Sequence, residues 1–335
     1  MFLQNRNPIM KHTPQLHEST FDNNCLSILN HMGRAWEDRA QVKQKQIEAG
    51  MAFSIEYDDF LDDLLPFHQH PLYEEVDDEI RTSILSAAWI AYNEKTIDIE
   101  SKIITPVCNR IIYSDLPGVD TDLYRWLAAE TLVDESYHIL MVLNTCRACR
   151  SHRDLMHLRL PDFELIQKID FQASQYAFEW QRDLLKLAAC IVSEVFISDY
   201  LSVLSNSDTV QPINRMTTEA HRQDELAHSK IFDTLAKEIF VNLSPKEKDF
   251  FCEVLPLPVR WFASKELPAW ESALNQIGFK HTREVIGDCQ AELDKTLMSI
   301  DYSELITLAT NMGILDTAIG QDAFEREGLL NNAKI

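Results

Sequence analysis

Two short blocks of acidic residues and histidine, ninety positions apart, contain the residue types that bind transition metals. Residues 134–138 read D-E-S-Y-H and residues 224–228 read D-E-L-A-H. In a helix, the Glu and the His of each block lie on one face, because positions three apart are neighbours on the helix surface. Helix bundles bind pairs of iron or manganese ions with a Glu-x-x-His motif on each of two helices. One motif alone is common by chance, so the prediction of a metal site depends on the repeat.

Each block follows a helical stretch that contains a single Glu among apolar residues. Glu100 precedes Glu135 by 35 residues, and Glu194 precedes Glu225 by 31 residues. Two helix pairs related by an approximate twofold axis would bring these four carboxylates together with the two histidines of the blocks. Buried carboxylates are costly unless they are paired, and two divalent ions would balance four negative charges. The alternative, solvated surface glutamates, fits poorly with apolar flanks such as I-V-S-E-V-F-I at residues 191–197.

His221 breaks the symmetry between the two halves of the sequence. It lies one helical turn before Glu225, whereas Thr131 occupies the corresponding position before Glu135. As a seventh ligand, His221 would make one metal ion richer in nitrogen ligands than the other. The alternative is a buried histidine that supports the site without binding metal.

The aspartates that begin the two blocks are predicted to orient the metal-binding histidines. A metal-bound imidazole needs a hydrogen-bond acceptor for its second ring nitrogen. Asp134 and Asp224 directly precede the two Glu ligands, on the flank of each helix that would face its partner. We therefore expect Asp134 to accept a hydrogen bond from His228, and Asp224 to accept one from His138. The alternative is that both carboxylates point into solvent.

Helical periodicity extends over most of the chain and predicts an all-α fold. The sequence has only 8 glycines among 335 residues and few runs of β-branched residues. Four long helices would form a four-helix metal-binding bundle at about residues 73–240, with approximate ranges of 73–104, 122–150, 163–204 and 210–239. The first helix is expected to end near Pro106, and the third is long enough to require a kink or a break.

The rest of the chain is predicted to surround this bundle with additional peripheral helices. Residues 21–51 have the pattern of an amphipathic helix, and prolines at 245, 256, 258 and 268 divide the C-terminal part into three or four shorter helices. Residues 1–20 lack periodicity and are expected to form a loose N-terminal segment. No linker-like composition interrupts the remainder, so we expect residues 21–335 to form a single helical domain.

The composition argues against several classes of partner. The 53 acidic and 31 basic residues give a net charge of −22, which disfavours binding to nucleic acid or to an anionic membrane. Apolar stretches such as residues 83–92 are far shorter than the roughly 20 residues that a membrane span needs. The N-terminus has no signal-peptide core, and the seven scattered cysteines are typical of reduced thiols. We therefore expect a cytoplasmic protein.

The chain resembles the non-haem di-iron N-oxygenases typified by p-aminobenzoate N-oxygenase. The resemblance covers about residues 75–240 and rests on the order Glu100, Glu135-x-x-His138, Glu194, His221-x-x-x-Glu225-x-x-His228. Six of these positions are shared with many ferritin-like oxidases, and the histidine at position 221 is the feature typical of the N-oxygenases. The resemblance implies a ferritin-like bundle, a homodimer, and two iron ions bound by all seven side chains. The same ligand types also suit manganese.

The reaction that the resemblance implies is the O2-dependent oxidation of a primary amine to a hydroxylamine, and onward to a nitroso or nitro compound, in secondary-metabolite biosynthesis. The amine would be aromatic, or aliphatic and derived from an amino acid. It would enter as a small molecule or tethered to a carrier protein. A reductase or a ferredoxin would supply the electrons.

Four residues within about two turns of the predicted ligands are candidates for the lining of a substrate pocket. They are Tyr92, Lys95, Thr96 and Thr131. In the enzyme for the aromatic acid, the resemblance implies an arginine that holds the substrate carboxylate, and Lys95 would be a weaker clamp. The alternative is that Lys95 is an exposed helix residue.

Two other functions are compatible with the same metal site. One is a di-iron hydroxylase or desaturase that acts on an acyl or aminoacyl group bound to a carrier protein. The other is a non-enzymatic, ferritin-like iron-binding protein. Assays with amine and acyl substrates would separate the first from an N-oxygenase, and the mass of the assembly would identify the second, because storage proteins form cages.

Overall fold

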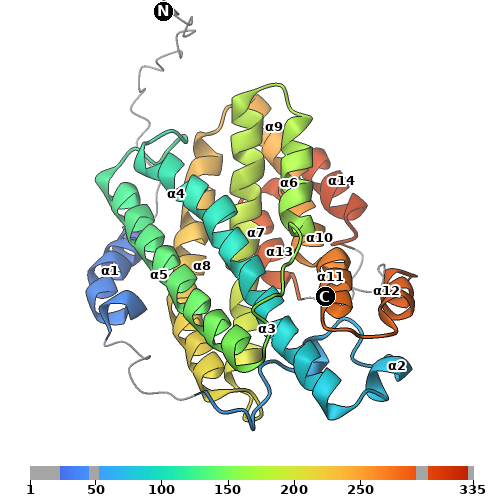
Figure 1. The fold of residues 1–335 in the computed structure, drawn as a ribbon. Helices are drawn as coiled ribbons and strands as arrows, with labels where there is room; N and C mark the ends of the chain where they lie inside the picture. Colours follow the sequence, from blue (N-terminus) through green and yellow to red (C-terminus); the bar gives the residue numbers. More distant parts are fainter. Residues whose placement is uncertain (1–22, 45–52, 292–300, 331–335) are drawn as a thin grey trace, which may run out of the picture.

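The structure, a computed structural model, describes residues 23–44, 53–291 and 301–330, and within these ranges it confirms the all-α fold (Figure 1). The described residues form no strand, only an isolated parallel bridge between Asp58 and Val210. The predicted loose segment 1–20 lies outside the described residues. The assignment of residues 21–335 to a single domain stays a prediction.

Four long helical segments form a closed bundle. They are α3 (Asp78–Ile99) with its continuation through the π-helical segment η3 (Glu100–Ile104) and α4 (Thr105–Ile112), α5 (Asp122–His152), α7 (Glu179–Ser205), and α8 (Pro212–Asn242). Asp77 and Thr121 cap the N-termini of α3 and α5 with side-chain oxygens. The helix α5 packs between α3–α4 and α8, and α7 packs against α8 and α4 (Figure 1). Each helix of the bundle therefore has two neighbours and one inward face.

The first long helix does not end near Pro106, and that prediction is wrong. The segment η3 widens the helix just before the proline, so that the Thr105 N–H bonds to the Glu100 carbonyl oxygen, five residues back. A proline inside a regular helix removes a hydrogen bond and clashes with the preceding turn. The wider turn lets Pro106 occupy the start of α4, and the chain remains helical to Ile112. Such π-helical turns are frequent at functional sites, and this one carries Glu100.

The predicted break in the third long helix is confirmed. Its two parts are α6 (Glu164–Ser174) and α7. Among the described residues, α7 is the one helix long and apolar enough to cross a membrane, so the expectation that all apolar stretches are too short is wrong for this segment. Most of this helix is buried, because it packs against α8, α6, α9 and α10. Its apolar character is that of a core helix.

The peripheral helices flank the bundle from both ends of the chain, and the C-terminal ones are more numerous than the three or four predicted for that part. The N-terminal ones are α1 (Asn23–Arg39), η1 (Gln41–Lys43), η2 (Asp62–Leu64) and α2 (Pro71–Glu74). The C-terminal ones are α9 (Pro245–Val254), α10 (Leu257–Phe262), α11 (Leu267–Gln276), α12 (Thr282–Ala291), α13 (Ser303–Asn311), η5 (Ile314–Asp316) and α14 (Ala318–Arg326). The helix α1 lies against α5 and α8, on the side of the bundle away from the C-terminal helices (Figure 1).

Two clusters of buried apolar side chains hold these elements together. The larger cluster fills the bundle and extends beneath the C-terminal helices, with Ile103, Leu127, Ile191 and Leu235 among its members. The smaller cluster joins the first half of α3 to α11, α12 and residues 60–73. The helix α3 belongs to both clusters, and it therefore links the interior of the bundle to the surface around α11.

Candidate metal centre

Seven buried side chains from the four bundle segments converge in the interior of the bundle. Six of them have no exposed surface, and His221 is 2% exposed. The seven are Glu100 from η3, Glu135 and His138 from α5, Glu194 from α7, and His221, Glu225 and His228 from α8. The Glu-x-x-His spacing places both side chains of each motif on the inward face of α5 or α8.

The seven side chains form two groups, each able to hold one metal ion. The ligand atoms of the first group lie within 4.8 Å of one another and belong to Glu100, His138 and His221. Those of the second group lie equally close and belong to Glu135, Glu194, Glu225 and His228. Nitrogen provides two of three ligand atoms in the first group and one of four in the second, so the two positions differ in ligand chemistry.

Two carboxylates lie between the groups. Glu135 faces a different histidine with each oxygen, with Oε2 3.6 Å from His138 Nδ1 and Oε1 2.9 Å from His228 Nδ1. Glu225 Oε1 lies 3.5 Å from His138 Nδ1, 3.0 Å from His221 Nε2 and 3.6 Å from His228 Nδ1. Glu135 and Glu225 therefore have the placement of ligands that bridge two ions.

Most of the donor atoms of this cluster are buried without hydrogen-bond partners. Buried polar atoms nearly always have a partner, and an unpaired buried carboxylate is costly. Half of the buried side-chain polar atoms that lack a hydrogen-bond partner in the described residues belong to the cluster: both carboxylate oxygens of Glu100, Glu135 and Glu194, Oε2 of Glu225, and Nδ1 of His138 and His228. The cluster thus fits two divalent ions, whose charge would compensate the four carboxylates.

Burial raises the pKa of Glu100 and of Glu194, the two carboxylates that do not lie between the groups. It raises the pKa of Glu100 to about 7, although the neighbouring His221 opposes the shift. Burial and the charge of Glu225 raise the pKa of Glu194 well above its usual value. Without a metal ion, Glu194 therefore favours its neutral form, and Glu100 is partly protonated near neutral pH.

The pKa values of His138, His228 and Glu225 are shifted so that the charged form of each group is favoured. Burial alone would lower the pKa values of His138 and His228, but the surrounding carboxylates raise both well above the usual value. Burial alone would raise the pKa of Glu225, but the adjacent imidazoles hold it well below its usual range. The metal-free cluster is thus a network of imidazolium and carboxylate groups, in which protons supply the positive charge.

The two aspartates contact the histidines of the opposite block. His138 Nε2 lies 3.1 Å from Asp224 Oδ2, and His228 Nε2 lies 3.2 Å from Asp134 Oδ2. The Nδ1 atoms of both histidines then face the cluster. This is the reciprocal arrangement that the sequence predicts, and neither aspartate points into solvent, since both are fully buried.

A segment outside the bundle binds both aspartates. Trp36 Nε1 on α1 donates to both carboxylate oxygens of Asp134 at 3.0 Å, and the backbone N–H of Gln41 donates to those of Asp224 at 3.2 and 3.3 Å. Arg39 Nη1 lies 3.8 Å from each aspartate. Sequence reasoning does not find these residues, because their partners are about 100 to 180 positions away in the chain and no spacing rule relates them.

Comparison with known proteins identifies the family. The family model described as P-aminobenzoate N-oxygenase AurF matches residues 25–313. The chain belongs to the p-aminobenzoate N-oxygenase family. A 4-aminobenzoate N-oxygenase of Streptomyces thioluteus is 28% identical over 304 residues, which are 90% of each chain. The N-oxygenase prediction is thereby confirmed, and neither a carrier-protein hydroxylase or desaturase nor an iron-binding storage protein is favoured.

The p-aminobenzoate N-oxygenase fold offers one cavity next to the helix that carries Glu100. This cavity of about 300 Å³ lies between α3, α11 and residues 60–66, and its walls are mainly apolar and aromatic. Of the four predicted pocket residues, Tyr92 and Lys95 line it. Lys95 precedes Glu100 by five residues, or about 8 Å along a helix axis. Measured along the axis of α3, the cavity residue Lys95 is therefore about 8 Å from the level of Glu100, and none of the metal-centre residues lines the cavity.

The three polar candidates for the pocket, Lys95, Thr96 and Thr131, differ in their surroundings. Lys95 is not an exposed residue, because its Nζ lies 3.1 Å from Glu266 Oε1 and donates to the Phe262 carbonyl oxygen at 3.1 Å. Thr96 is buried, and its hydroxyl donates to the Tyr92 carbonyl oxygen. Thr131 is buried with a hydroxyl that has no hydrogen-bond partner. Thr96 and Thr131 are not part of the cavity wall, and Glu266 is a pocket residue that sequence reasoning did not find.

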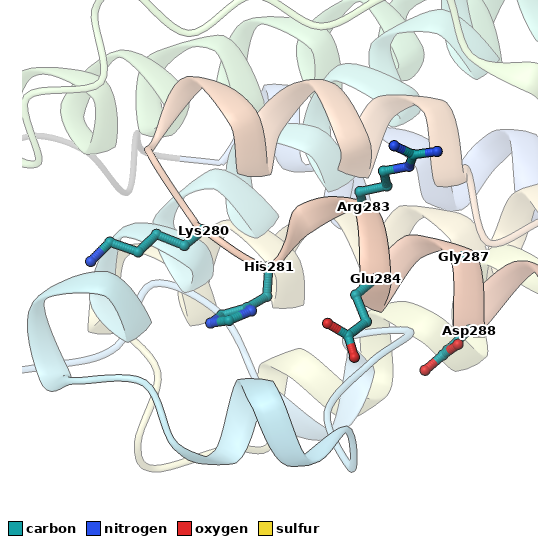
Figure 2. A pocket seen from close by; sticks show the side chains of 6 residues that line it. All are labelled: Lys280, His281, Arg283, Glu284, Gly287 and Asp288. Carbon is teal, nitrogen blue, oxygen red and sulfur yellow. The ribbon is translucent and has the colours of Figure 1, made fainter.

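A second cavity, of about 480 Å³, lies at α12 in this N-oxygenase (Figure 2). Its lining residues are Lys280, His281, Arg283, Glu284, Gly287 and Asp288. Figure 2 shows Lys280 and Arg283 pointing in different directions, with Glu284 and Asp288 extending away from the guanidinium of Arg283. These mixed charges do not converge on one point, and none of the metal-centre residues takes part.

Replacing His221 by alanine tests the unequal ligand sets of this N-oxygenase. We expect the variant to bind about one iron per chain in place of two, because the first group keeps only Glu100 and His138 of its own while the second group stays complete. Anaerobic titration with Fe(II) and metal analysis after desalting measure this ratio. Two tightly bound ions in the variant would remove His221 from the ligand set.

Glu130 is a buried carboxyl group outside the metal cluster, one turn before Asp134 on α5. It is 6% exposed, Trp126 Nε1 donates to its Oε1, and its Oε2 has no hydrogen-bond partner. Burial raises its pKa to about 7. The folded protein therefore keeps a proton on Glu130 that the unfolded chain releases above its usual pKa of 4.5.

We expect Glu130→Gln to stabilise the protein at alkaline pH. The free energy of unfolding of the wild type falls as pH rises from 4.5 to about 7, because the unfolded state binds fewer protons there, and it stays lower above pH 7. Glutamine keeps an oxygen that accepts the hydrogen bond from Trp126 Nε1, and because it does not titrate, the free energy of unfolding does not fall in this way as pH rises. The expected gain at pH 8 is about 1–2 kcal/mol, reduced from the full shift for solvent screening. Urea unfolding at pH 4.5 and pH 8 measures it, and equal differences at both values would contradict the cause.

Proposed function

We propose that this protein is a di-iron N-oxygenase that uses O2 to oxidise a primary aryl amine to a hydroxylamine and onward to a nitroso or nitro compound. The observation that carries the proposal is the set of buried, unpartnered donor atoms in two adjacent groups. Membership of the p-aminobenzoate N-oxygenase family supports it, as does a 4-aminobenzoate N-oxygenase relative that spans 90% of the chain.

All seven residues are proposed as ligands, with Glu135 and Glu225 as bridges. Two iron ions held there would supply the binding and reduction of O2 and the oxidising equivalents for the amine nitrogen. The full burial of six ligands excludes bulk water from the site. Asp134 and Asp224 fix the imidazole rings so that Nδ1 faces the cluster. The ligand types also suit manganese, so iron is the part of the proposal that metal analysis tests.

The amine is proposed to enter through the cavity beside α3. Its apolar wall suits an aromatic ring, and Tyr92 lies where the cavity meets the helix that leads to Glu100. Thr131 has a free hydroxyl one turn before Glu135, and we assign it a hydrogen bond to the reacting amine or to a water molecule. The charge of Lys95 is balanced by Glu266, so the cavity is proposed to accept an aryl amine with a neutral group at its far end as well as a carboxylate.

The remaining partners follow from the reaction and the surface. Oxidation of an amine to a hydroxylamine by O2 consumes two electrons and two protons and releases water, so a reductase or a ferredoxin is part of the proposal. We also propose a homodimer, in the cytoplasm, within secondary-metabolite biosynthesis. The surface that supports a dimer is a stripe of exposed apolar residues on α5, namely Trp126, Val133 and Leu140, spaced by seven like the seam of packed helices.

The decisive experiment is reconstitution without air followed by oxygen and substrate. Apoprotein is loaded with two equivalents of Fe(II), chemically reduced, and mixed with O2 and either 4-aminobenzoate or 4-aminobenzamide. We expect the hydroxylamine and its more oxidised products by mass spectrometry, with 18O from labelled O2. A protein that binds two irons but leaves both amines unchanged, while an acyl substrate is hydroxylated, would contradict the proposed function.

A further inference from the structure

The helix α1 and the turn η1 lie outside the repeated helix pairs. Each of them contacts both α5 and α8. The neutral donors Trp36 and Gln41 each bind one aspartate through both of its oxygens. The two aspartates are equivalent in the repeat and are buried completely. The segment 36–41 therefore contacts the corresponding aspartates of α5 and α8, on the side of the bundle where α1 lies (Figure 1).

Arg39 is the basic residue of this segment that lies near both aspartates. Its Nη1 lies at the same distance, 3.8 Å, from Asp134 Oδ2 and from Asp224 Oδ1, and its side chain is 23% exposed. Both Nε and Nη1 are buried and make no hydrogen bond. The guanidinium thus acts on both carboxylates through charge, midway between them, and favours neither over the other.

We propose that Arg39 is a positioning residue that serves both metal positions at once. Two carboxylates taken out of water repel each other, and a positive charge close to both of them offsets this repulsion. Each of them accepts from the Nε2 atom of one histidine and so fixes the ring whose Nδ1 faces the cluster. Removing the guanidinium leaves the aspartates without this counter-charge. They turn apart, and the rings of His138 and His228 turn with them.

This role has a consequence that a support of one ligand would not have. His138 belongs to the first group and His228 to the second. Loss of one aspartate would affect one group directly, whereas loss of Arg39 affects both groups to a similar degree. Changes to residues that orient metal ligands weaken metal binding by roughly 10- to 100-fold. The inference rests on the proposed ligand set and adds a residue that binds no metal.

The experiment compares Fe(II) binding by the full-length apoprotein and three variants of α1, by anaerobic calorimetric titration. Arg39→Met is expected to weaken both binding events by about tenfold. Arg34→Met changes an exposed arginine on the same helix and is expected to bind as the wild type does. Leu29→Ala removes a fully buried side chain of α1 and loosens its packing without changing the aspartate contacts. It is expected to lower the unfolding temperature of the apoprotein and to bind iron nearly as the wild type does.

The outcomes separate the possibilities. Unchanged iron affinity in Arg39→Met, a loss confined to one of the two binding events, or an equal loss in Leu29→Ala would each overturn the role of Arg39. If Arg39→Met does not fold, Arg39→Gln takes its place under the same criteria. Wild-type protein that binds no iron would overturn the ligand set, and this inference with it. Two bound irons in the wild type together with unchanged Arg39→Met would overturn this inference alone.

Discussion

Glu225→Ala is expected to abolish N-oxygenation and to leave less than one tightly bound iron per chain. Glu225 Oε1 is within 3.6 Å of the facing nitrogen of three histidines, two of them in the first group and one in the second, so its loss opens both positions. Residues that merely orient ligands change metal affinity or activity by roughly 10- to 100-fold, so loss of a bridging ligand should lower kcat/KM by more than about 100-fold. Metal analysis and product formation from an aryl amine measure the two effects.

The matched control is a glutamate on the same helix outside the cluster. Glu219 forms an ion pair with Arg222 and its side chain is 42% exposed. Glu219→Ala should retain two irons and nearly full activity, because exposed ion pairs contribute little to stability. Glu225→Ala with two irons and wild-type turnover would contradict the bridging role, and with it the proposed function.

Removing the metal ions is expected to lower the unfolding temperature by at least about 5 °C. A ligand that binds only the folded state stabilises it by about 2.7 kcal/mol when its concentration is 100 times the dissociation constant. One kcal/mol corresponds to about 2–4 °C for chains somewhat shorter than this one. The metal-free protein also keeps four carboxylates in its interior. Calorimetry of the apoprotein with and without two equivalents of Fe(II) or Mn(II), under anaerobic conditions for Fe(II), measures the difference.

Glu194→Leu provides the contrasting variant for the same measurement. Leaving a buried polar group without hydrogen-bond partners costs free energy, and replacing Glu194 by an apolar side chain of similar volume removes that cost. The apoprotein of this variant should therefore unfold at a higher temperature than wild-type apoprotein, and added metal should raise that temperature less. A wild-type apoprotein as stable as the metal-loaded wild type would show that the cluster does not need cations.

The positions of the cluster residues could be predicted from sequence because helical spacing alone relates Glu135 to His138 and Glu225 to His228. Helix geometry places residues three and four apart on one face, and the repeat of the motif indicates two helices that face each other. The solitary Glu100 and Glu194 followed from their apolar surroundings. Even the pairing of each aspartate with the opposite histidine follows from a local rule, since a metal-binding imidazole needs an acceptor.

Contacts made by other parts of the chain could not be predicted in this way. Trp36 reaches Asp134 across 98 residues, and Lys95 reaches Glu266 across 171, so only the folded chain brings them together. The rule that a proline ends a helix was wrong at Pro106, because a π-helical turn removes the clash on which the rule depends. The apolar run of α7 is longer than expected from the sequence, because Lys186, Glu194 and Asp199 divide it into shorter apolar stretches.

The protonation state of the cluster makes metal uptake an exchange of cations. In the metal-free protein, the pKa values of His138 and His228 are raised well above their usual value, Glu194 favours its neutral form, and Glu100, with a pKa of about 7, is partly protonated near neutral pH. Coordination requires neutral imidazole and ionised carboxylate, so every ion that enters must expel protons into the surrounding solution. Loading the protein in a weakly buffered medium will therefore acidify it, and acid will compete with iron for the same atoms.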